Sequence, residues 1–175
     1  MSAFERTLIT NNSPYLQYLD GDVDTLTAQQ KEGLLLFFGK ANCSSCHDGP
    51  MLSDFNYHAL GIPENVKHPN GVDRGKDGLF RFRTPTLHNV AITGPNMHNG
   101  KLETLIEVVD YMIISVSDNP LVTQCMLDPE FKHLHLDQDE RYQLVAFLES
   151  LTDEDFDKTV PESVPSGLPV GGNIN

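Results

Sequence analysis

The sequence is poor in three features, and each shortage excludes a class of protein. Its 175 residues hold 12 Lys and Arg against 25 Asp and Glu, a formal charge of -13. Binding a phosphate backbone needs concentrated positive charge, so we expect no nucleic-acid partner. No apolar run approaches the roughly 18 residues of a membrane-spanning helix, so we expect no membrane span. No strand alternation persists and no internal repeat is visible, which leaves an all-α fold class with long loops.

The beginning of the sequence also lacks something, namely the basic start and long apolar centre of a secretory signal. We therefore expect the sequence as given to carry no targeting signal. Its length suits one domain with a core of its own, although 13 Gly and 11 Pro indicate that much of it is loop. We assign residues 1–157 to this domain and residues 158–175 to an extended tail rich in Pro and Gly.

Three segments carry the start signals of helices, which we predict over residues 27–38, 104–117 and 137–151. Each start is a Thr or Asp followed three residues later by Gln or Glu, and the pairs are Thr27 with Gln30, Thr104 with Glu107 and Asp137 with Glu140. Such pairs can satisfy the free N–H groups of a first helical turn. Gly39 is placed to end the first of these helices. Residues 4–9 are a further candidate for a short helix.

Residues 48–99 have no helical pattern and are punctuated by turn signals such as Gly49-Pro50 and Gly94-Pro95. So long an irregular stretch inside a compact domain counts against the assignment, unless the chain wraps around something that supplies the missing core. We therefore expect a bound group with a large apolar surface.

The most informative feature is the pentapeptide Cys43-Ser44-Ser45-Cys46-His47. Three cysteines in all do not make a disulfide framework. Covalent haem explains the motif, because two thiols one helical turn apart add to the two vinyl groups of the porphyrin and His47 then lies beneath the iron. A flat apolar haem would also supply the surface that residues 48–99 lack.

Zinc binding and dithiol redox chemistry each account for less of the motif. Structural zinc needs a second ligand pair at matching spacing, and neither Cys125 alone nor His133 with His135 provides a regular one. A thioredoxin-like redox pair belongs in a βαβ context, which is not visible around Cys43 and Cys46. We therefore interpret the motif as a haem c attachment site.

The sixth position of the iron decides what such a haem does. A methionine sulfur there makes an electron carrier, whereas an open position can bind peroxide or a gas. Met1 is a terminus and Met51 lies too near the attachment motif to reach the other face. Spacing leaves two methionines equally open: Met97 in a loop and Met112 on the apolar face of a predicted helix.

Five stretches together resemble a known family. They are FERTLI at 4–9, GKANCSSCHDGP at 39–50, FRTPTLHNV at 82–90, GPNMHNG at 94–100 and TLIEVV at 104–109. In these stretches the sequence is similar to the C-terminal half of the bacterial di-haem cytochrome c peroxidases, to which the methylamine-utilisation di-haem enzymes are related. The resemblance covers residues 3–152. In that family this half holds the electron-accepting haem of higher potential.

The resemblance implies roles for particular residues. It makes His47 the proximal ligand and places the distal Met fourteen residues after His98, at Met112, so that Met97 becomes a loop residue. It implies a calcium ion bound by the backbone carbonyls of Thr93 and Pro95.

Two further positions follow from the same resemblance. His98 matches a residue that reaches towards the other haem, and Arg83 matches a basic residue near the haem propionates, for which a guanidinium is suited. His88 stands where the family commonly has Arg.

The resemblance also implies a function: relay of electrons from a small donor protein, a cytochrome c or a cupredoxin, to a peroxidatic haem in an N-terminal domain. The family has two attachment motifs and this sequence has one, so we expect one haem c and little peroxidase activity from this chain alone. The alternatives are a five-coordinate haem with its own peroxidase activity, for which His98 is the candidate acid-base group, and a haem-based sensor or docking module. Since haem c is attached outside the cytoplasm, we expect a periplasmic protein.

The remaining polar residues are interpreted as structural. We expect Cys125 to be an inert buried thiol and the acidic residues 153–157 to be a solvated helix end. The histidines expected on the surface or in loops are His58, His68, His133 and His135.

Overall fold

The computed structural model describes residues 9–67, 71–155, 162–163, 165 and 167. Within these ranges the α-helices are α2 (Pro14–Leu19), α3 (Ala28–Phe38), α4 (Leu105–Ile114) and α5 (Gln138–Glu149). The short 3-10 helices are η1 (Cys43–Ser45), η2 (Val90–Ile92) and η3 (Gln124–Met126), and the strands are β1 (Tyr57–His58) and β2 (Phe82–Arg83). The expected all-α class with few helices and long loops is confirmed. No described helix has both the length and the apolar character needed to cross a bilayer.

The candidate helix at residues 4–9 lies outside the described residues except for Ile9, which is not helical. His68 and most of the tail at 158–175 also lie outside them.

The predicted helix starts are all present. In α3, α4 and α5 the Thr or Asp side chain accepts from the backbone N–H three residues on, and the Gln or Glu at that position accepts from the cap in return. Gly39 ends α3 as predicted. α4 ends three residues before the predicted Ser117, because Ser115 takes a left-handed φ of 52° and closes the helix. α2 was not predicted, although Ser13 followed by Pro14 is a recognised start.

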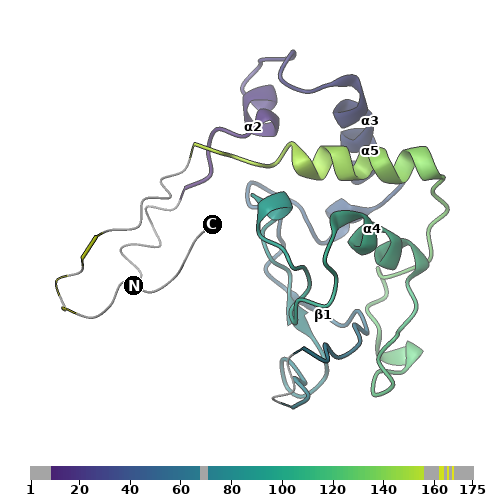
Figure 1. Cartoon of the computed structure of the whole chain (residues 1–175). Coiled ribbons are helices and arrows are strands. Elements are labelled where there is room, and N and C mark those ends of the chain that lie inside the picture. Colours follow the sequence, from purple (N-terminus) through teal and green to yellow (C-terminus); the bar gives the residue numbers. More distant parts are fainter. Residues whose placement is uncertain (1–8, 68–70, 156–161, 164, 166, 168–175) are drawn as a thin grey trace.

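We call α2 to α5 the helical half of the molecule. α5 packs against both α3 and α4, as Figure 1 shows, with α2 beside the C-terminal end of α5. The core between them includes Phe37, Phe147 and Leu151, all with essentially no exposure. The Phe147 ring meets Tyr15 edge-on at 5.3 Å and Phe37 at 5.0 Å between ring centroids. These contacts bury the apolar face of α5.

The close crossing of α3 and α5 depends on Gly33. A Cβ atom at this position would overlap the carbonyl oxygen of Gln143 in α5 and crowd Phe147. Glycine within a helix costs about 1 kcal/mol relative to alanine, so its presence here is explained by the approach of the two backbones.

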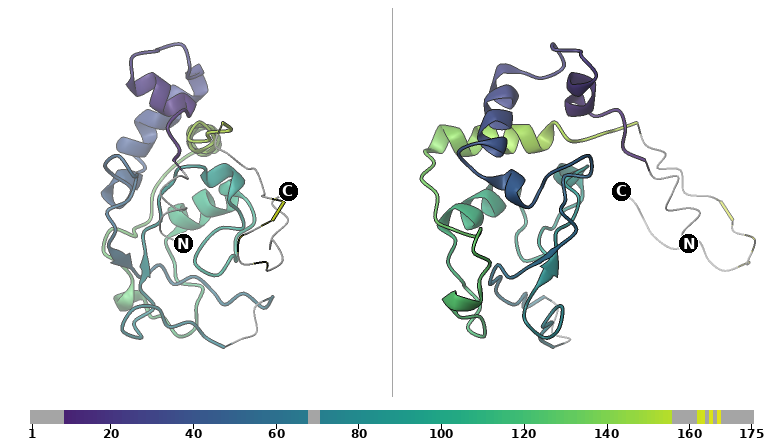
Figure 2. Two further views of the ribbon diagram at one scale, coloured as in Figure 1. Left: turned by 90° about the vertical axis from the view of Figure 1, so that its left-hand side faces the viewer. Right: turned by 180° about the vertical axis from the view of Figure 1, so that it is seen from behind.

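Residues 48–67, 71–104 and 115–136 form what we call the loop half, which lies mostly below the helices in Figures 1 and 2. Its described regular elements are η2, η3 and the antiparallel pair of β1 and β2, with Tyr57 opposite Arg83. A second apolar cluster holds it together, formed by Ile62, Phe80, Tyr111, Val122, Leu127 and Phe131. Buried amides tie its segments: Asn65 donates to the carbonyls of Asn99 and Gly100, and Asn119 donates to that of Ile62.

One expectation for the end of α5 is wrong. Asp153 is not solvated but buried, with 2% of its surface exposed. Its Oδ2 accepts from the backbone N–H groups of Asn11 and Asn12 at 2.9 Å, and these bonds keep its pKa low although burial alone would raise it. Asp153 therefore anchors the chain that leads into α2.

Candidate functional site

A cavity of about 450 Å³ lies between the helical half and the loop half. Its apolar wall includes Phe37, Leu87, Val109, Ile113, Leu144 and Leu148. The structure also brings to this cavity every residue that the sequence singled out for a haem or calcium site, namely Cys43, Cys46, His47, Arg83, Thr93, Pro95, His98 and Met112. Residues up to 69 positions apart in the sequence thus meet at one site.

The attachment motif reaches the cavity through a tight turn after α3. Asn42 has a left-handed φ of 53°, which starts η1. The N–H groups of Cys46 and His47 then both donate to the carbonyl of Cys43, at 3.3 Å and 3.0 Å. This single turn sets the two cysteines one helical turn apart, with His47 directly after them.

His47 is held in the form that a metal requires. Its Nδ1 lies 2.9 Å from the carbonyl oxygen of Leu52, so this nitrogen carries the hydrogen and donates it. Burial lowers the pKa of His47 more than this hydrogen bond raises it, which keeps the ring neutral. Nε2 is then left with its lone pair, and the hydrogen bond to Leu52 fixes the ring orientation.

The three cysteines differ in environment. Burial raises the pKa of Cys43 to about 12 and raises that of Cys46 as well, so both are neutral thiols at the cavity wall. Cys125 was expected to be buried, and this is wrong: it is exposed in η3, with its Sγ 3.1 Å from the hydroxyl of Thr123.

Two sulfur donors line the cavity besides the cysteines. Met112 comes from α4, on the same helix as the wall residues Val109 and Ile113. Met97 comes from the loop after η2 and has a left-handed φ of 70°. Both are half-buried beside the second apolar cluster.

His98 and Arg83 each rest on an aromatic ring of the loop half. The His98 ring stacks on Phe82 with 3.4 Å between centroids and 10° between planes. Partial burial lowers the pKa of His98, so it is neutral at pH 7. The guanidinium of Arg83 lies 4.8 Å above the centre of the Phe55 ring.

The remaining predicted positions lie at the edge of this site. Thr93 and Pro95 are exposed residues that follow η2 and border the cavity. His88 is not among the residues that line it: its Nε2 lies 2.9 Å from the Pro50 carbonyl, and its Nδ1 is buried without a partner among the described residues.

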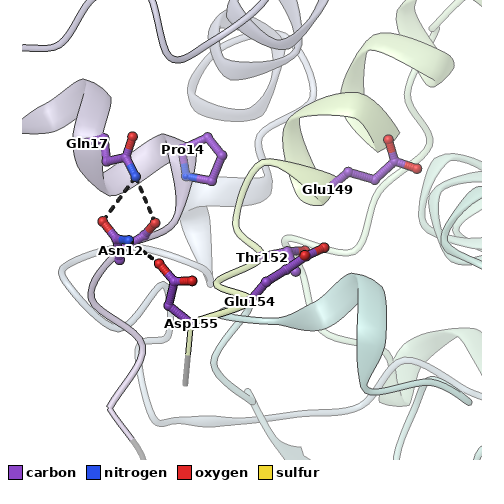
Figure 3. A pocket seen from close by; sticks show the side chains of 7 residues that line it. All are labelled: Asn12, Pro14, Gln17, Glu149, Thr152, Glu154 and Asp155. Carbon is purple, nitrogen blue, oxygen red and sulfur yellow. Dashed lines mark hydrogen bonds between the residues drawn. The ribbon is translucent and has the colours of Figure 1, made fainter. Parts of the chain in front are cut away.

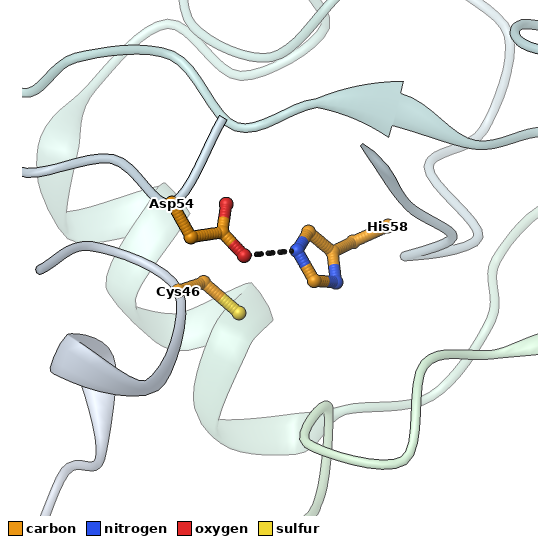
Figure 4. A group of neighbouring side chains, drawn as sticks. All are labelled: Cys46, Asp54 and His58. Carbon is orange, nitrogen blue, oxygen red and sulfur yellow. Dashed lines mark hydrogen bonds and ion pairs between the residues drawn. The ribbon is translucent and has the colours of Figure 1, made fainter. Parts of the chain in front are cut away.

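Sequence reasoning missed one member of the site, His58, which was expected on the surface or in a loop. The structure holds it half-buried at the cavity wall between two carboxylates, those of Asp54 and Asp128. Figure 4 shows the contact with Asp54. Its Nε2 lies 2.9 Å from Asp54 and its Nδ1 2.6 Å from Asp128. Burial alone would lower the pKa of His58, but the two carboxylates outweigh it and raise this pKa. We call these three residues the His58 clamp.

The clamp lies beside the attachment motif. A metal ion could in principle be held by Cys46, Asp54 and His58, since their ligand atoms lie within 4.8 Å of one another. Both ring nitrogens of His58 already face carboxylate oxygens, however, so the ring has no lone pair to offer. The spacing of Asp54 and His58 was visible in the sequence, whereas Asp128 lies 70 residues further on.

A second hollow lies away from this site, beside α2 and the C-terminal end of α5 (Figure 3). Its volume is about 300 Å³ and its lining is polar and acidic, including Asn12, Glu149 and Asp155. It shares no residue with the cavity at Cys43 and His47.

The residues of the large cavity fit a covalent haem. The volume is in the range of roughly 300–1,000 Å³ that is usual for cofactor sites, and the wall is mainly apolar. Two neutral thiols, an imidazole anchored through Nδ1 and methionine sulfur are the donor set of a c-type haem.

Comparisons with known proteins agree with this geometry. The diheme peroxidase BthA from Burkholderia thailandensis E264 superposes with a TM-score of 0.69 and 25% identity, over 83% of this chain and 47% of its own. Cytochrome-c peroxidase IdrP2 of Denitromonas iodatirespirans is 32% identical over 90% of this chain and 49% of its own length. The chain is a homologue of di-haem cytochrome c peroxidases over about half of their length.

Other members extend the comparison. Methylamine utilization protein MauG of Methylorubrum extorquens is 33% identical over 93% of this chain and 45% of its own length. A MauG-like protein associated with microbial copper homeostasis superposes with a TM-score of 0.77 and 29% identity, over 89% of this chain and 56% of its own. No protein-family model matches the chain. The chain spans about half the length of the curated relatives it matches. The relatives support a haem-binding domain of the peroxidase type.

Proposed function

We propose that this chain is a haem c electron-transfer domain in which Cys43 and Cys46 hold one haem and His47 and Met112 ligate its iron. The observation that carries the proposal is that all four residues line one apolar cavity. When bound, the haem supplies a one-electron couple, and a methionine sulfur ligand favours its reduced form. The apolar wall keeps water away from the couple and favours the form of lower charge.

The chain's own residues position the group. The carbonyl oxygen of Leu52 accepts a hydrogen bond from Nδ1 of His47, which leaves Nε2 available to the iron. Arg83, stacked on Phe55, presents a guanidinium at the cavity edge, where it can pair with a propionate. We assign the carbonyls of Thr93 and Pro95 to a calcium ion, since neutral oxygen donors suit this hard cation.

We further propose that this chain corresponds to the C-terminal half of a longer enzyme in the periplasm. It would accept electrons from a small donor protein, a cytochrome c or a cupredoxin, and pass them to a peroxidatic haem in an N-terminal domain. The support is that its relatives are about twice as long and that a structural relative is described as a diheme peroxidase.

A second candidate function has one observation in its favour. His98 is a neutral imidazole at the wall of the same cavity. If no methionine ligates the iron, His98 is placed to move protons for peroxide cleavage at an open position, and the chain would be a peroxidase on its own.

The two methionines make the test. We expect Met112→Ala to abolish the weak far-red sulfur-to-iron absorption band of the oxidised holoprotein and to create peroxide binding. Met97→Ala is the matched control, since it removes a methionine from the same cavity wall, and it should keep the band. The reverse result would transfer the ligand role to Met97. A wild-type holoprotein that has no such band and turns over peroxide would favour the second function.

A further inference from the structure

A cluster of positive charge stands out in this acidic molecule. Residues 71–83 contain four basic and two acidic side chains, a net charge of +2, so the rest of the chain carries -15. The four cations, Arg74, Lys76, Arg81 and Arg83, are all exposed. We call them the basic ladder.

None of these four cations has a carboxylate partner, which they share with Lys31 and Lys101 among the described residues. Lys40, Lys67, Lys132 and Arg141 each form an ion pair with a Glu or Asp. None of the ladder cations has a carboxylate within 4.0 Å among the described residues, even though Asp73 and Asp77 are close in sequence. The charge of Arg74, Lys76 and Arg81 is therefore available to a partner, whereas Arg83 also lines the cavity and is assigned above to a haem propionate.

The backbone fixes the ladder as one surface. Lys76 donates its N–H to the carbonyl of Arg81 at 2.9 Å, which sets these two residues side by side. Gly75 makes this possible, because it has a φ of 59° and a Cβ there would overlap the Arg81 carbonyl. Strand β2 then carries the surface from Arg81 to Arg83, which pairs with Tyr57 of β1.

Aromatic rings hold two of the cations in place. The Lys76 ammonium lies 4.2 Å from the centre of the Tyr57 ring, and the Arg83 guanidinium lies 4.8 Å from that of Phe55. Tyr57 and Phe55 are 41% and 48% exposed, so these stacks lie on the surface. Preordered side chains lose little entropy on binding, and Arg and Tyr are among the residues that dominate protein interfaces.

The ladder also adjoins the cavity. Arg83 lines it, and so does its neighbour Phe82. A partner bound to the ladder would therefore lie next to the edge of a haem held in that cavity.

We propose that the basic ladder is the docking surface for an acidic patch of an electron-transfer partner protein. This rests on the proposed haem function for its purpose, though not for the existence of the surface. A protein fits better than a nucleic acid or a membrane, because an extended polyanion would also meet the -15 charge of the rest of the chain, whereas a compact acidic patch meets only the ladder.

The first test locates the surface without using any activity. Hexacyanochromate(III), a redox-inert paramagnetic trianion, is added to the haem-loaded protein, and line broadening of backbone amides is recorded by NMR. We expect broadening at residues 55–57 and 74–83. Replacing Lys76 and Arg81 together by Gln should weaken it roughly tenfold. Lys31→Gln is the control, since Lys31 also lies over a tyrosine ring, that of the half-buried Tyr18, but in the helical half. Uniform broadening, or the same loss in both variants, would overturn the proposal.

Two further probes distinguish the partner class. A hexaglutamate peptide should broaden or shift the same amides at about 0.15 M salt, and a 20-nucleotide single-stranded DNA should bind more weakly. Tighter binding of the DNA at these amides would contradict the protein assignment. So would salt-sensitive dimerisation of the chain that the double variant abolishes, because the partner would then be a second copy.

The last test links the surface to electron transfer. Each reduced haem iron gives one electron to one hexacyanoferrate(III), which becomes hexacyanoferrate(II). The rate should fall as salt is added, although the net charge of -13 alone would make it rise. The double variant should react roughly tenfold more slowly at low salt and Lys31→Gln at the wild-type rate. A protein that binds no haem would refute the proposed function and still give the NMR map, so the two failures are separable.

Discussion

The helical and loop halves reach their structures by different means. The helical half has a dry core of its own around Phe37, Phe147 and Leu151, and its helices begin at capping pairs that lie within four residues of sequence. The loop half has a smaller apolar cluster, and its segments are tied by buried amides and by the His58 clamp. Local signals are thus sufficient for one half, whereas the other depends on long-range contacts and on what fills the cavity.

The backbone of the loop half also depends on its surroundings. Non-glycine residues with left-handed φ there include Leu52, Phe55, Phe80 and Met97, with φ between 47° and 70°. Such conformations cost of order 1–3 kcal/mol each and persist only where the surroundings enforce them. We therefore expect the loop half to lose more than the helical half when its central group is removed.

Removing the haem attachment should give the largest effect. In a Cys43→Ser, Cys46→Ser double variant we expect a protein mass without haem and amide exchange at least about 100-fold faster across residues 57–103, with a smaller change in α3 and α5. Mass spectrometry with hydrogen exchange measures both. Cys125→Ser, which changes the exposed thiol, should behave like wild type. Equal acceleration in the two halves would show that both depend on the haem to the same degree.

A methyl group at the crossing of α3 and α5 tests the helical half. Gly33→Ala should lower the free energy of unfolding by roughly 1–3 kcal/mol, since its Cβ would overlap the Gln143 carbonyl. Helix propensity alone predicts a gain of about 1 kcal/mol, so the sign of the change is decisive. Denaturant unfolding of the holoprotein gives the value. Gln29→Ala, on the exposed side of α3, should stay within about 0.5 kcal/mol of wild type.

The His58 clamp tests the loop half through pH. We expect His58→Gln to cost about 2 kcal/mol near pH 5.5, where the imidazolium bonds both carboxylates. The folded pKa of His58 is raised, so its contribution is full below the ordinary value of about 6.5 and is lost as pH rises through the folded value.

The protonation of Asp54 sets the lowest pH at which His58 contributes to stability. Burial would raise its pKa, but its hydrogen bonds hold this pKa at about 2, so its contribution is lost as pH falls from about 4 towards that value. The stability difference between wild type and His58→Gln should therefore be greatest between about pH 4 and 6.5. His133→Gln, at an exposed position, should show no such profile. A difference that grows from pH 6 to 9 would refute the charged clamp.

The sequence also predicted the helical half better than the loop half. The three capping pairs gave the starts of α3, α4 and α5, because a capping box is a contact between residues three apart. Ser115 shows the limit even there: nothing in its neighbours signalled the left-handed turn that ends α4 early.

At the site, the sequence predicted the attachment motif from its own spacing, whereas Arg83, His98 and Met112 were named through a family resemblance. Only the fold shows that these side chains share a cavity. His58 and Asp153 were both misjudged as solvated, since their partners Asp128 and Asn11 lie 70 and 142 residues away. Contacts of that range leave no local pattern.

The wall of the cavity has a consequence for the order of assembly during biosynthesis. Leu144 and Leu148 of the last helix contribute to it, roughly a hundred residues after the thiols that take the porphyrin. A nascent chain that has been synthesised only as far as His47 contains the attachment site but lacks the later residues that enclose the cavity. Ligation of porphyrin to such a chain would precede the closing of the pocket, and the cofactor would act as a template on which the later segments settle.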